Sequence, residues 1–334
     1  MGADSAIEWT HHTFNPWRGC TKVSPGCEHC YAETLSKRNP SALGTWGPGG
    51  TRVVAAESYW RQPLRWNRDA AAAGDRRRVF CASLADVFED WRGHVLDAQG
   101  NVLWRNPQGD VIRAGLTPVG NPIAQGYRPA TLDDVRRRLF RLIEQTPHLD
   151  WLLLTKRPEA IGRLWAARDS LGDGRVLRNL WLGTTCEDQR RADERIPHLL
   201  AVPAAVRFLS VEPLLGPVDL RAYLDGSTRW SVRTNATRID WVIVGGESGP
   251  GARSCEVAWI RDVVRQCREA SVPVFVKQVG SSPRGGGDVG PDGIERCERW
   301  SSFTRPADAK GGDPQEWPSD LRVREFPREE VRRG

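Results

Sequence analysis

Seven short apolar runs, each four or five residues long, recur along the chain between polar and helical stretches. Apolar runs of this length without alternation are typical of strands that are buried on both faces of a parallel sheet. Strands that alternate with helices are joined by right-handed crossovers. We therefore predict an α/β protein with six to seven parallel strands in an open or closed barrel, the strands being 7–10, 79–82, 151–155, 180–183, 206–210, 241–245 and 274–277.

Helical patterns separate the later strands. Thr131 is a suitable N-cap, acidic residues follow it in the first turn, and the apolar residues of 135–143 form one stripe. Further helices are predicted over about 158–167, 189–200 and 257–270. With 334 residues and a hydrophobic content of 39%, the chain can bury one large core or two modest ones.

Two regions interrupt this alternation of strands and helices. Residues 92–126 contain turn-forming sequences between short apolar runs, which predicts a small β insertion. Residues 281–334 begin with a Gly- and Pro-rich stretch, and we expect them to pack as an extension on a barrel formed by residues 1–280. No apolar run approaches the roughly 20 residues that span a bilayer, and the N-terminus lacks signal-peptide features. We expect a cytoplasmic protein with no membrane partner.

Three cysteines near the N-terminus, Cys20, Cys27 and Cys30, follow the pattern C-x6-C-x2-C. In a cytosolic chain, eight cysteines indicate metal or redox chemistry rather than a disulfide framework. Cysteine thiolates hold iron–sulfur clusters, and a [4Fe–4S] cluster on three cysteines leaves one iron open. A structural zinc needs a fourth protein ligand, for which the candidates are His11, His12 and His29. The other cysteines are interpreted as structural, except Cys186: they are Cys81, Cys255, Cys267 and Cys297.

Polar residues follow most of the predicted strands, where the chemistry of parallel α/β barrels gathers. Loop starts and helix caps favour Ser, Thr and Asp anyway. Six such clusters at one set of strand ends, together with the cysteines after the first strand, nevertheless predict a polar ligand site facing a metal. Lysine provides only five of the 48 basic residues, so two lysines at strand ends indicate a need for a compact ammonium group. The clusters contain Ser83, Asp86, Lys156, Thr185, Cys186, Glu187, Ser210, Glu212, Gly245, Gly246, Glu247 and Lys277.

The composition also bears on partners. A net charge of +6 and 15 tryptophans suit a polyanionic partner whose bases stack on aromatic rings. The arginine excess of a GC-rich genome and the usual burial of tryptophan explain the same numbers. The sequence therefore leaves a nucleic-acid partner open.

Several longer segments together resemble a phage-associated family of unknown function with a three-cysteine motif, which is described as radical-SAM-like and is similar in layout to spore photoproduct lyase. The resemblance covers nearly the whole chain except residues 92–126. The segments that carry it are 7–10 with 15–16, 20–33, 154–159, 208–215, 244–250 and 316–322.

This resemblance implies a partial (β/α) barrel of TIM type whose [4Fe–4S] cluster is held by Cys20, Cys27 and Cys30. S-adenosylmethionine would bind the open iron, and its reductive cleavage would give a 5′-deoxyadenosyl radical that abstracts hydrogen from a substrate. An electron donor such as a flavodoxin or ferredoxin is implied, as is a nucleic acid or nucleotide-like substrate in DNA repair or modification. The usual spacing is C-x3-C-x2-C, and a turn at Pro25-Gly26 can absorb the extra residues here.

The resemblance also implies roles for single residues. His29 would lie near the adenine, Ser83 and Asp86 would receive the methionine ammonium, and Thr185 and Glu187 would lie near the ribose. Ser210, Glu212 and the segment Gly245-Gly246-Glu247 would line the pocket. Lys156, indicated above by the rarity of lysine, is counted among the candidate cofactor-binding residues. Two residues are candidate catalytic groups, Lys277 and Cys186, the latter as a hydrogen donor or as inert packing.

Two alternatives stay open at this point. A radical enzyme of this kind could act on a peptide or a small metabolite instead of a nucleic acid. A non-catalytic protein could use the cysteines to hold zinc or a structural cluster and bind nucleic acid without turnover.

Overall fold

The computed structural model describes residues 5–166, 177–226, 238–287, 299–300 and 304–327. The chain divides into two compact units. The first unit comprises residues 1–23 and 30–180, and the second comprises residues 24–29 and 181–334. The segment 24–29, which carries Cys27, thus belongs to the second unit although its neighbours in sequence belong to the first.

The first unit contains three parallel strands in the order β1 (His12–Thr13), β4 (Arg77–Cys81) and β8 (Leu149–Thr155). Six of the seven residues of β8 are buried, as predicted for a strand covered on both faces. A short antiparallel pair, β2 (Trp17–Arg18) and β3 (Val53–Val54), lies outside this order.

The first predicted strand is wrong. Residues 7–10 form a turn in which the Thr10 amide donates to the Ile7 carbonyl (3.1 Å), and β1 begins only at His12. Trp9 is a core residue nonetheless, and its ring packs against Phe80 with a centroid distance of 4.7 Å. An apolar run can therefore mark burial without marking a strand.

Helix α5 (Leu132–Glu144) confirms the helix predicted after Thr131. Thr131 and Asp134 form a capping box, in which each side chain satisfies a backbone amide at the start of the helix. The helix predicted over 158–167 begins as η4 and continues as α6. The remaining helices of this unit were not predicted; α4, for example, buries only three residues, so its apolar stripe is thin. The helices are α1 (Tyr31–Arg38), α2 (Pro40–Leu43), α3 (Glu57–Trp60), α4 (Gln62–Ala72), η4 (Pro158–Ala160) and α6 (Ile161–Ala166).

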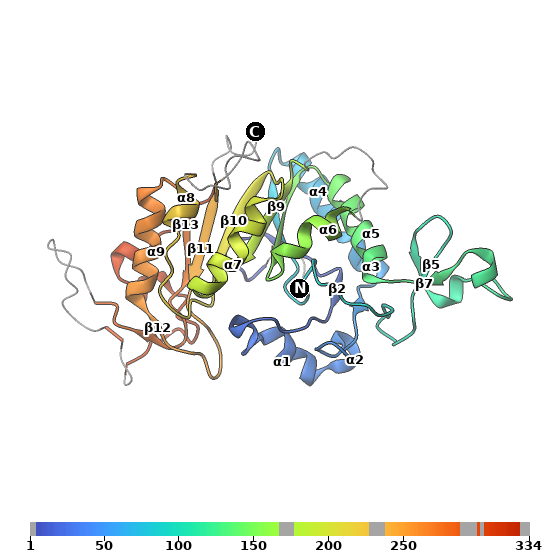
Figure 1. Ribbon diagram of the computed structural model, residues 1–334, viewed down its shortest axis with the longest axis horizontal. Helices are drawn as coiled ribbons and strands as arrows, with labels where there is room; N and C mark the ends of the chain where they lie inside the picture. The colour runs from blue at the N-terminus through green and yellow to red at the C-terminus, as the bar shows by residue number, and fades with distance from the viewer. Residues whose placement is uncertain (1–4, 167–176, 227–237, 288–298, 301–303, 328–334) are drawn as a thin grey trace. The chain divides into compact units, whose positions relative to one another are not determined.

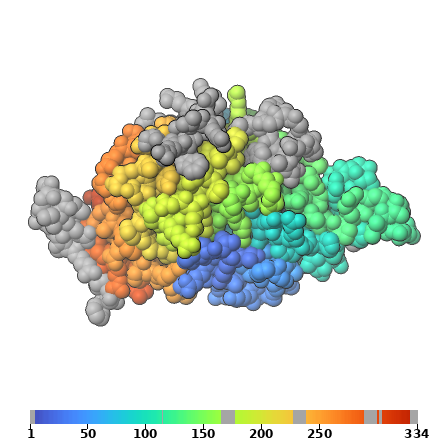
Figure 2. Space-filling model, in the orientation of Figure 1, coloured from blue at the N-terminus to red at the C-terminus, as the bar shows by residue number. Residues whose placement is uncertain are grey.

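The predicted β insertion carries a small antiparallel sheet in the order β6-β5-β7, and Figure 2 shows this blue-green segment extending from the rest of the first unit. Its last strand lies just beyond the predicted end at residue 126. Three apolar side chains of this segment are exposed: Leu116, Val119 and Ile123. The elements are β5 (Trp104–Arg105), β6 (Val111–Ile112), η2 (Ala114–Leu116), η3 (Ile123–Gln125) and β7 (Arg128–Pro129).

The second unit contains four parallel strands in the order β9 (Leu180–Thr185), β10 (Val206–Val211), β11 (Trp241–Gly245) and β13 (Val274–Gln278). Every residue of β9, β10 and β11 is buried. The helices predicted over 189–200 and 257–270 are present as α7 (Gln189–Leu200) and α9 (Val257–Glu269), and Figure 1 shows α9 beside β11 and β13. The shorter elements are η1 (Pro25–Cys27), α8 (Arg221–Leu224), β12 (Cys255–Glu256), β14 (Pro283–Arg284), η7 (Pro314–Glu316) and η8 (Ser319–Leu321).

The described part of the C-terminal tail packs within the second unit. The Val276 amide donates to the Val323 carbonyl (2.9 Å), and the Glu325 amide donates to the Val274 carbonyl (2.9 Å). Trp317 is fully buried, which anchors the tail in the core. The domain boundary at residue 280 stays a prediction.

The mixed α/β class with parallel strands is confirmed. Three strands in the first unit and four in the second agree with the predicted six to seven. Cys81, Cys255 and Cys267 are buried, as expected for structural cysteines, whereas Cys297 lies outside the described residues. In the part of the chain that the structure describes, no helix combines the length and apolar character needed to cross a membrane.

Candidate functional site

The loop after β4 is fixed to the end of β8 by one buried carboxylate, Asp86. It accepts hydrogen bonds from the Thr155 hydroxyl (2.7 Å), the amides of Phe88 (3.0 Å) and Lys156 (3.2 Å), and Nη1 of Arg157 (2.8 Å). Four donors use about the full acceptor capacity of a carboxylate. The methionine ammonium that the sequence analysis assigns to Asp86 would therefore have to displace one of them.

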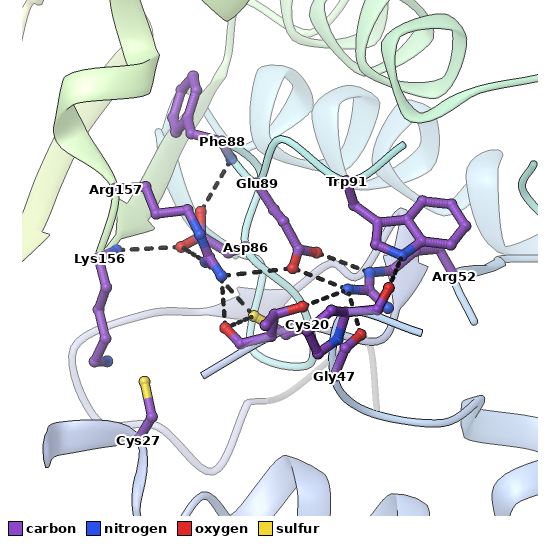
Figure 3. A network of polar contacts seen from close by, with 12 residues as sticks. Cys20, Cys27, Gly47, Arg52, Asp86, Phe88, Glu89, Trp91, Lys156 and Arg157 are labelled. Atoms are coloured by element: carbon purple, nitrogen blue, oxygen red, sulfur yellow. Dashed lines mark hydrogen bonds and ion pairs between the residues drawn. The ribbon is translucent and has the colours of Figure 1, made fainter. Parts of the chain in front are cut away.

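Arg157 links this carboxylate to the first motif cysteine (Figure 3). Its Nη1 lies 3.7 Å from Sγ of Cys20, and its Nη2 donates to the Thr21 carbonyl at 2.5 Å. Burial, together with the charges of Asp86 and Glu89, raises the pKa of Cys20 to about 12, although Arg157 opposes this shift. Without a cation, the Cys20 thiol is thus protonated at neutral pH.

A second arginine, Arg52, binds both Glu89 and Thr21, the residue that follows Cys20. Arg52 is fully buried, and its Nε and Nη2 bind the two oxygens of Glu89 at 2.7 and 2.9 Å. Its Nη2 also donates to the Thr21 hydroxyl (3.0 Å), and the Trp91 ring covers the guanidinium at 4.8 Å (Figure 3). Buried bidentate pairs of this kind fix geometry more than they add stability.

Asn15, just after β1, positions Ser83 at the end of β4. Its Oδ1 accepts from the Leu84 amide (2.7 Å) and its Nδ2 donates to the Ser83 hydroxyl (3.1 Å). Tyr31 donates to the Ser83 carbonyl (2.8 Å), and the residue before it, Cys30, is the N-cap residue of α1. The first unit thus places Cys20, Cys30, Ser83 and Asp86 on connected elements.

Lys156 differs from the arginines of this unit. Its amide donates to Asp86, and the residue is half-buried, but its ammonium has no hydrogen bond or ion pair to any residue that the structure describes. Since Arg52 and Arg157 are paired with carboxylates, Lys156 is the cation of this group that remains available to an incoming anion.

In the second unit, Glu247 holds the segment of Cys27 to the end of β11. It binds Nδ1 of His29 (3.0 Å) and accepts from the amide, Nε and Nη2 of Arg253 at 2.9, 2.9 and 2.5 Å. Nη1 of Arg253 also donates to the Pro25 carbonyl (3.0 Å) and to Oε2 of Glu28 (3.0 Å). Burial raises the pKa of Glu247, but the hydrogen bonds from Arg253 and His29 outweigh it and lower the pKa to about 2.

Glu187, after β9, contacts the same segment. It is fully buried, pairs with Nη1 of Arg195 (2.6 Å) and accepts from the Gly26 amide (3.3 Å). A Cβ atom at Gly26 would lie 3.0 Å from this carboxylate, so the approach needs a glycine. Glu187 and Glu247, two of the carboxylates predicted for the cofactor pocket, therefore position the Cys27 segment.

Four further predicted residues of this unit lie in or directly after β9, β10 and β13. Glu212 pairs with Nζ of Lys277 (2.6 Å) and also accepts from Nε2 of Gln278 (3.1 Å). Thr185 is the register partner of Ser210, and its hydroxyl is buried without a hydrogen-bond partner among the described residues. An unsatisfied buried hydroxyl costs about 1–3 kcal/mol, which a ligand could recover.

Cys186 and the two glycines have structural explanations. Cys186 is fully buried, and burial raises the pKa of its thiol far above the usual range. A Cβ atom at Gly246 would lie 2.4 Å from the Val279 carbonyl, and one at Gly245 would lie 3.0 Å from the Gln278 carbonyl. The close approach expected of a ligand at these glycines is made by the chain itself.

One family model, described as "Protein of unknown function (DUF5131)", matches residues 4–108 and 121–310. The chain belongs to the DUF5131 family. The match includes all three motif cysteines and every polar strand end described above, and it omits residues 109–120 of the insertion. No curated protein and no solved structure matches the chain. The family's description assigns no activity, so the function has to be argued from the site.

The metal-binding capacity of this DUF5131 protein depends on its cysteines. Cys20, Cys27 and Cys30 are free and half-buried. Within the described ranges, no three His, Cys, Asp or Glu side chains are grouped so that they could hold a metal ion. The chemistry of the donors does fit an iron–sulfur cluster, because three thiols outside any disulfide are what such a cluster binds.

The histidines proposed as a fourth zinc ligand have other contacts. Nδ1 of His11 accepts from the Arg78 amide (2.8 Å), and the His12 ring stacks on Trp66 with a centroid distance of 4.3 Å. His29 binds Glu247 through Nδ1 (3.0 Å). A zinc site would have to recruit one of these rings from its present contacts.

Five residues of the site had no role predicted from the sequence: Asn15, Arg52, Arg157, Arg195 and Arg253. Asn15 and Arg157 lie in segments that carry the resemblance, which was the available signal. The other three arginines gave none, because arginine is abundant throughout the chain.

Proposed function

We propose that this protein is a radical S-adenosylmethionine enzyme of the phage-associated three-cysteine type, with a partial (β/α) barrel and a [4Fe–4S] cluster on Cys20, Cys27 and Cys30. One observation carries the proposal. In each unit, a segment that bears a motif cysteine is fixed to the ends of parallel strands by carboxylate–arginine pairs whose carboxylates are buried. Contacts outside the ligand set orient the ligands of metal sites in this way.

When bound, the cluster and S-adenosylmethionine would supply a 5′-deoxyadenosyl radical that abstracts hydrogen from the substrate. The chain binds and orients these groups. Arg157 would hold Cys20 from the first unit, and Glu247 with Glu187 would hold the Cys27 segment in the second. The half-buried positions of the three thiols limit access of water to the ligands.

The cofactor's methionine moiety carries a carboxylate and an ammonium group. Lys156 supports the binding of the carboxylate because its ammonium has no partner in the described structure. Ser83 and Asp86 are the acceptors for the ammonium, with Asp86 exchanging one of its present donors. In the second unit, the Thr185 hydroxyl is the group that gains most from a ribose hydroxyl.

The proposed substrate is a nucleic acid or a nucleotide-like molecule, which the net charge of +6 supports. The step belongs to DNA repair or modification, and the electron comes from a donor such as a flavodoxin or ferredoxin. Cys186 would serve as a hydrogen-atom donor, a role that requires the protonated thiol its burial favours. Lys277, held by Glu212, would position the substrate.

Anaerobic reconstitution with iron and sulfide tests the proposal, followed by reduction with dithionite and assay of 5′-deoxyadenosine. We expect product from the wild type, and loss of both cluster absorbance and product in Cys27→Ala. The matched control is Cys267→Ala, which removes a buried thiol from α9 and should retain the cluster. A protein that binds one zinc and no iron would instead indicate a non-catalytic, metal-binding nucleic-acid-binding protein.

A further inference from the structure

Arg157 occupies an unusual position among the arginines of the first unit, because its guanidinium contacts the sulfur of a proposed cluster ligand. Nη1 lies 3.7 Å from Sγ of Cys20 and 2.8 Å from Oδ2 of Asp86. Nη2 lies 2.5 Å from the Thr21 carbonyl and 3.5 Å from Oε1 of Glu89. The side chain is 11% exposed, so these contacts form away from bulk water.

We infer that Arg157 is a positioning residue that keeps an N–H···S hydrogen bond on the Cys20 thiolate of the loaded cluster and raises the cluster's reduction potential. The inference rests on the proposed function and deepens it, because it identifies Arg157 as a residue that sets how readily the cluster accepts an electron. Hydrogen bonds to the cysteine sulfurs, net charge and burial are the main protein factors that set cluster potentials.

The direction of the effect follows from charge. The reduced cluster carries one more negative charge than the oxidised cluster, so a cationic donor at its sulfur stabilises the reduced form more. The local charges balance in pairs, Arg157 with Asp86 and Arg52 with Glu89. Removal of the Arg157 charge would leave an excess carboxylate near Cys20 and would disfavour the added electron.

The geometry also explains why an arginine is needed. One planar guanidinium reaches the carboxylate of Asp86 and the Cys20 sulfur (Figure 3). It reaches the Thr21 carbonyl at the same time. A lysine ammonium at the end of a flexible chain is a point charge and does not present a fixed fork of donors. Arg157 itself is held in orientation by Asp86, which in turn binds the end of β8.

The test is a redox titration of the reconstituted full-length protein. The electron paramagnetic resonance signal of the reduced cluster measures the reduced fraction at each potential. For Arg157→Gln we expect an equilibrium constant for reduction about tenfold lower, which for a one-electron couple is a midpoint potential about 59 mV more negative. Arg157→Lys keeps the charge but not the fork of donors. We therefore expect its midpoint potential to shift by less than half as much as that of Arg157→Gln.

Arg163→Gln is the matched control, since it removes a guanidinium that is 55% exposed and paired with Asp90 on the surface. We expect its equilibrium constant for reduction to stay within twofold of the wild-type value. Equal potentials in wild type and Arg157→Gln, with cluster present in both, would overturn the inference while leaving the proposed function intact. A wild type that assembles no cluster would overturn both.

A measurement on the wild type keeps the inference testable if the Gln variant does not fold. Protein labelled with ¹⁵N-arginine is reduced, and pulsed electron paramagnetic resonance records couplings of ¹⁵N to the cluster. We expect a coupling that is absent from Arg157→Lys and retained in Arg163→Gln. Absence of the coupling from the wild type would contradict the N–H···S contact.

Discussion

At the scale of single residues, Lys156 is set apart by the ion pairs of the arginines around it. The surrounding arginines are neutralised by carboxylates, whereas the Lys156 ammonium meets no acidic partner in the described residues. The sequence indicated this position through the rarity of lysine. It could not show which basic groups are already paired, because Glu89 and Asp86 approach their arginines only in the folded chain.

Lys156→Met should weaken binding of S-adenosylmethionine about tenfold, since a charge-assisted contact to the carboxylate contributes about 1.4 kcal/mol. Cluster absorbance should stay unchanged because Lys156 contacts no motif cysteine within the first unit. Anaerobic isothermal titration calorimetry measures the dissociation constant. Lys37→Met is the control, as this lysine is 72% exposed and paired with Glu33 on α1. Equal affinity in Lys156→Met and wild type would remove Lys156 from the site.

At the scale of elements, strands and helices were predictable to different degrees. The sequence runs that form the parallel strands from β8 to β13 are continuous and apolar. The start of α5 could be predicted from Thr131 and the acidic first turn, which form a capping box. Helix α4 buries Trp66 and Ala70 but presents a mostly polar surface, so periodicity did not reveal it. The clamping of the Cys27 segment by Glu187 and Glu247 was not predictable, since it depends on Arg195 and Arg253, which are remote from Cys27 in sequence.

The Glu247 clamp gives an expected dependence of stability on pH. Its pKa is about 2 in the folded protein and 4.5 ordinarily, so its contribution to the free energy of unfolding is complete above about pH 4.5 and is lost as the pH falls toward 2. Glu247→Gln should cost about 1–3 kcal/mol at pH 7 because it weakens a buried charged network. The difference between variant and wild type should shrink as the pH falls through that window.

Urea unfolding at several pH values measures this difference for Glu247. Glu194→Gln provides the comparison, because Glu194 also pairs with an arginine but is 49% exposed on α7. Its loss should change stability little at any pH. A constant gap between Glu247→Gln and wild type from pH 7 to pH 3 would show that the ionised carboxylate is not what stabilises the clamp.

At the scale of the whole molecule, the family match and the exposure pattern both set one segment apart. Residues 109–120 are omitted from the match, and they contain Leu116 and Val119, which are 68% and 100% exposed. The segment contains β6, whose only apolar burial is at Val111. On either side of it, β5 and β7 pair directly with each other, with Trp104 opposite Pro129. The hairpin of β5 and β7 therefore does not need the segment.

We expect that replacing residues 109–120 by an Asn-Gly turn lowers the free energy of unfolding by at most about 2 kcal/mol, the contribution of one buried valine. A shorter connection costs little to close, and Asn-Gly supplies turn-forming residues between 108 and 121. Iron content and affinity for S-adenosylmethionine should match the wild type, because the site residues lie in matched ranges. Urea unfolding measures the stability, and iron analysis measures the cluster content.

As the comparison, removal of residues 104–129 should destabilise the first unit more strongly, since it disrupts the junction where the Ala130 amide donates to the Leu103 carbonyl at 2.8 Å. Loss of iron on the smaller deletion would show that the cluster site depends on this segment, contrary to the independence that the exposure pattern indicates.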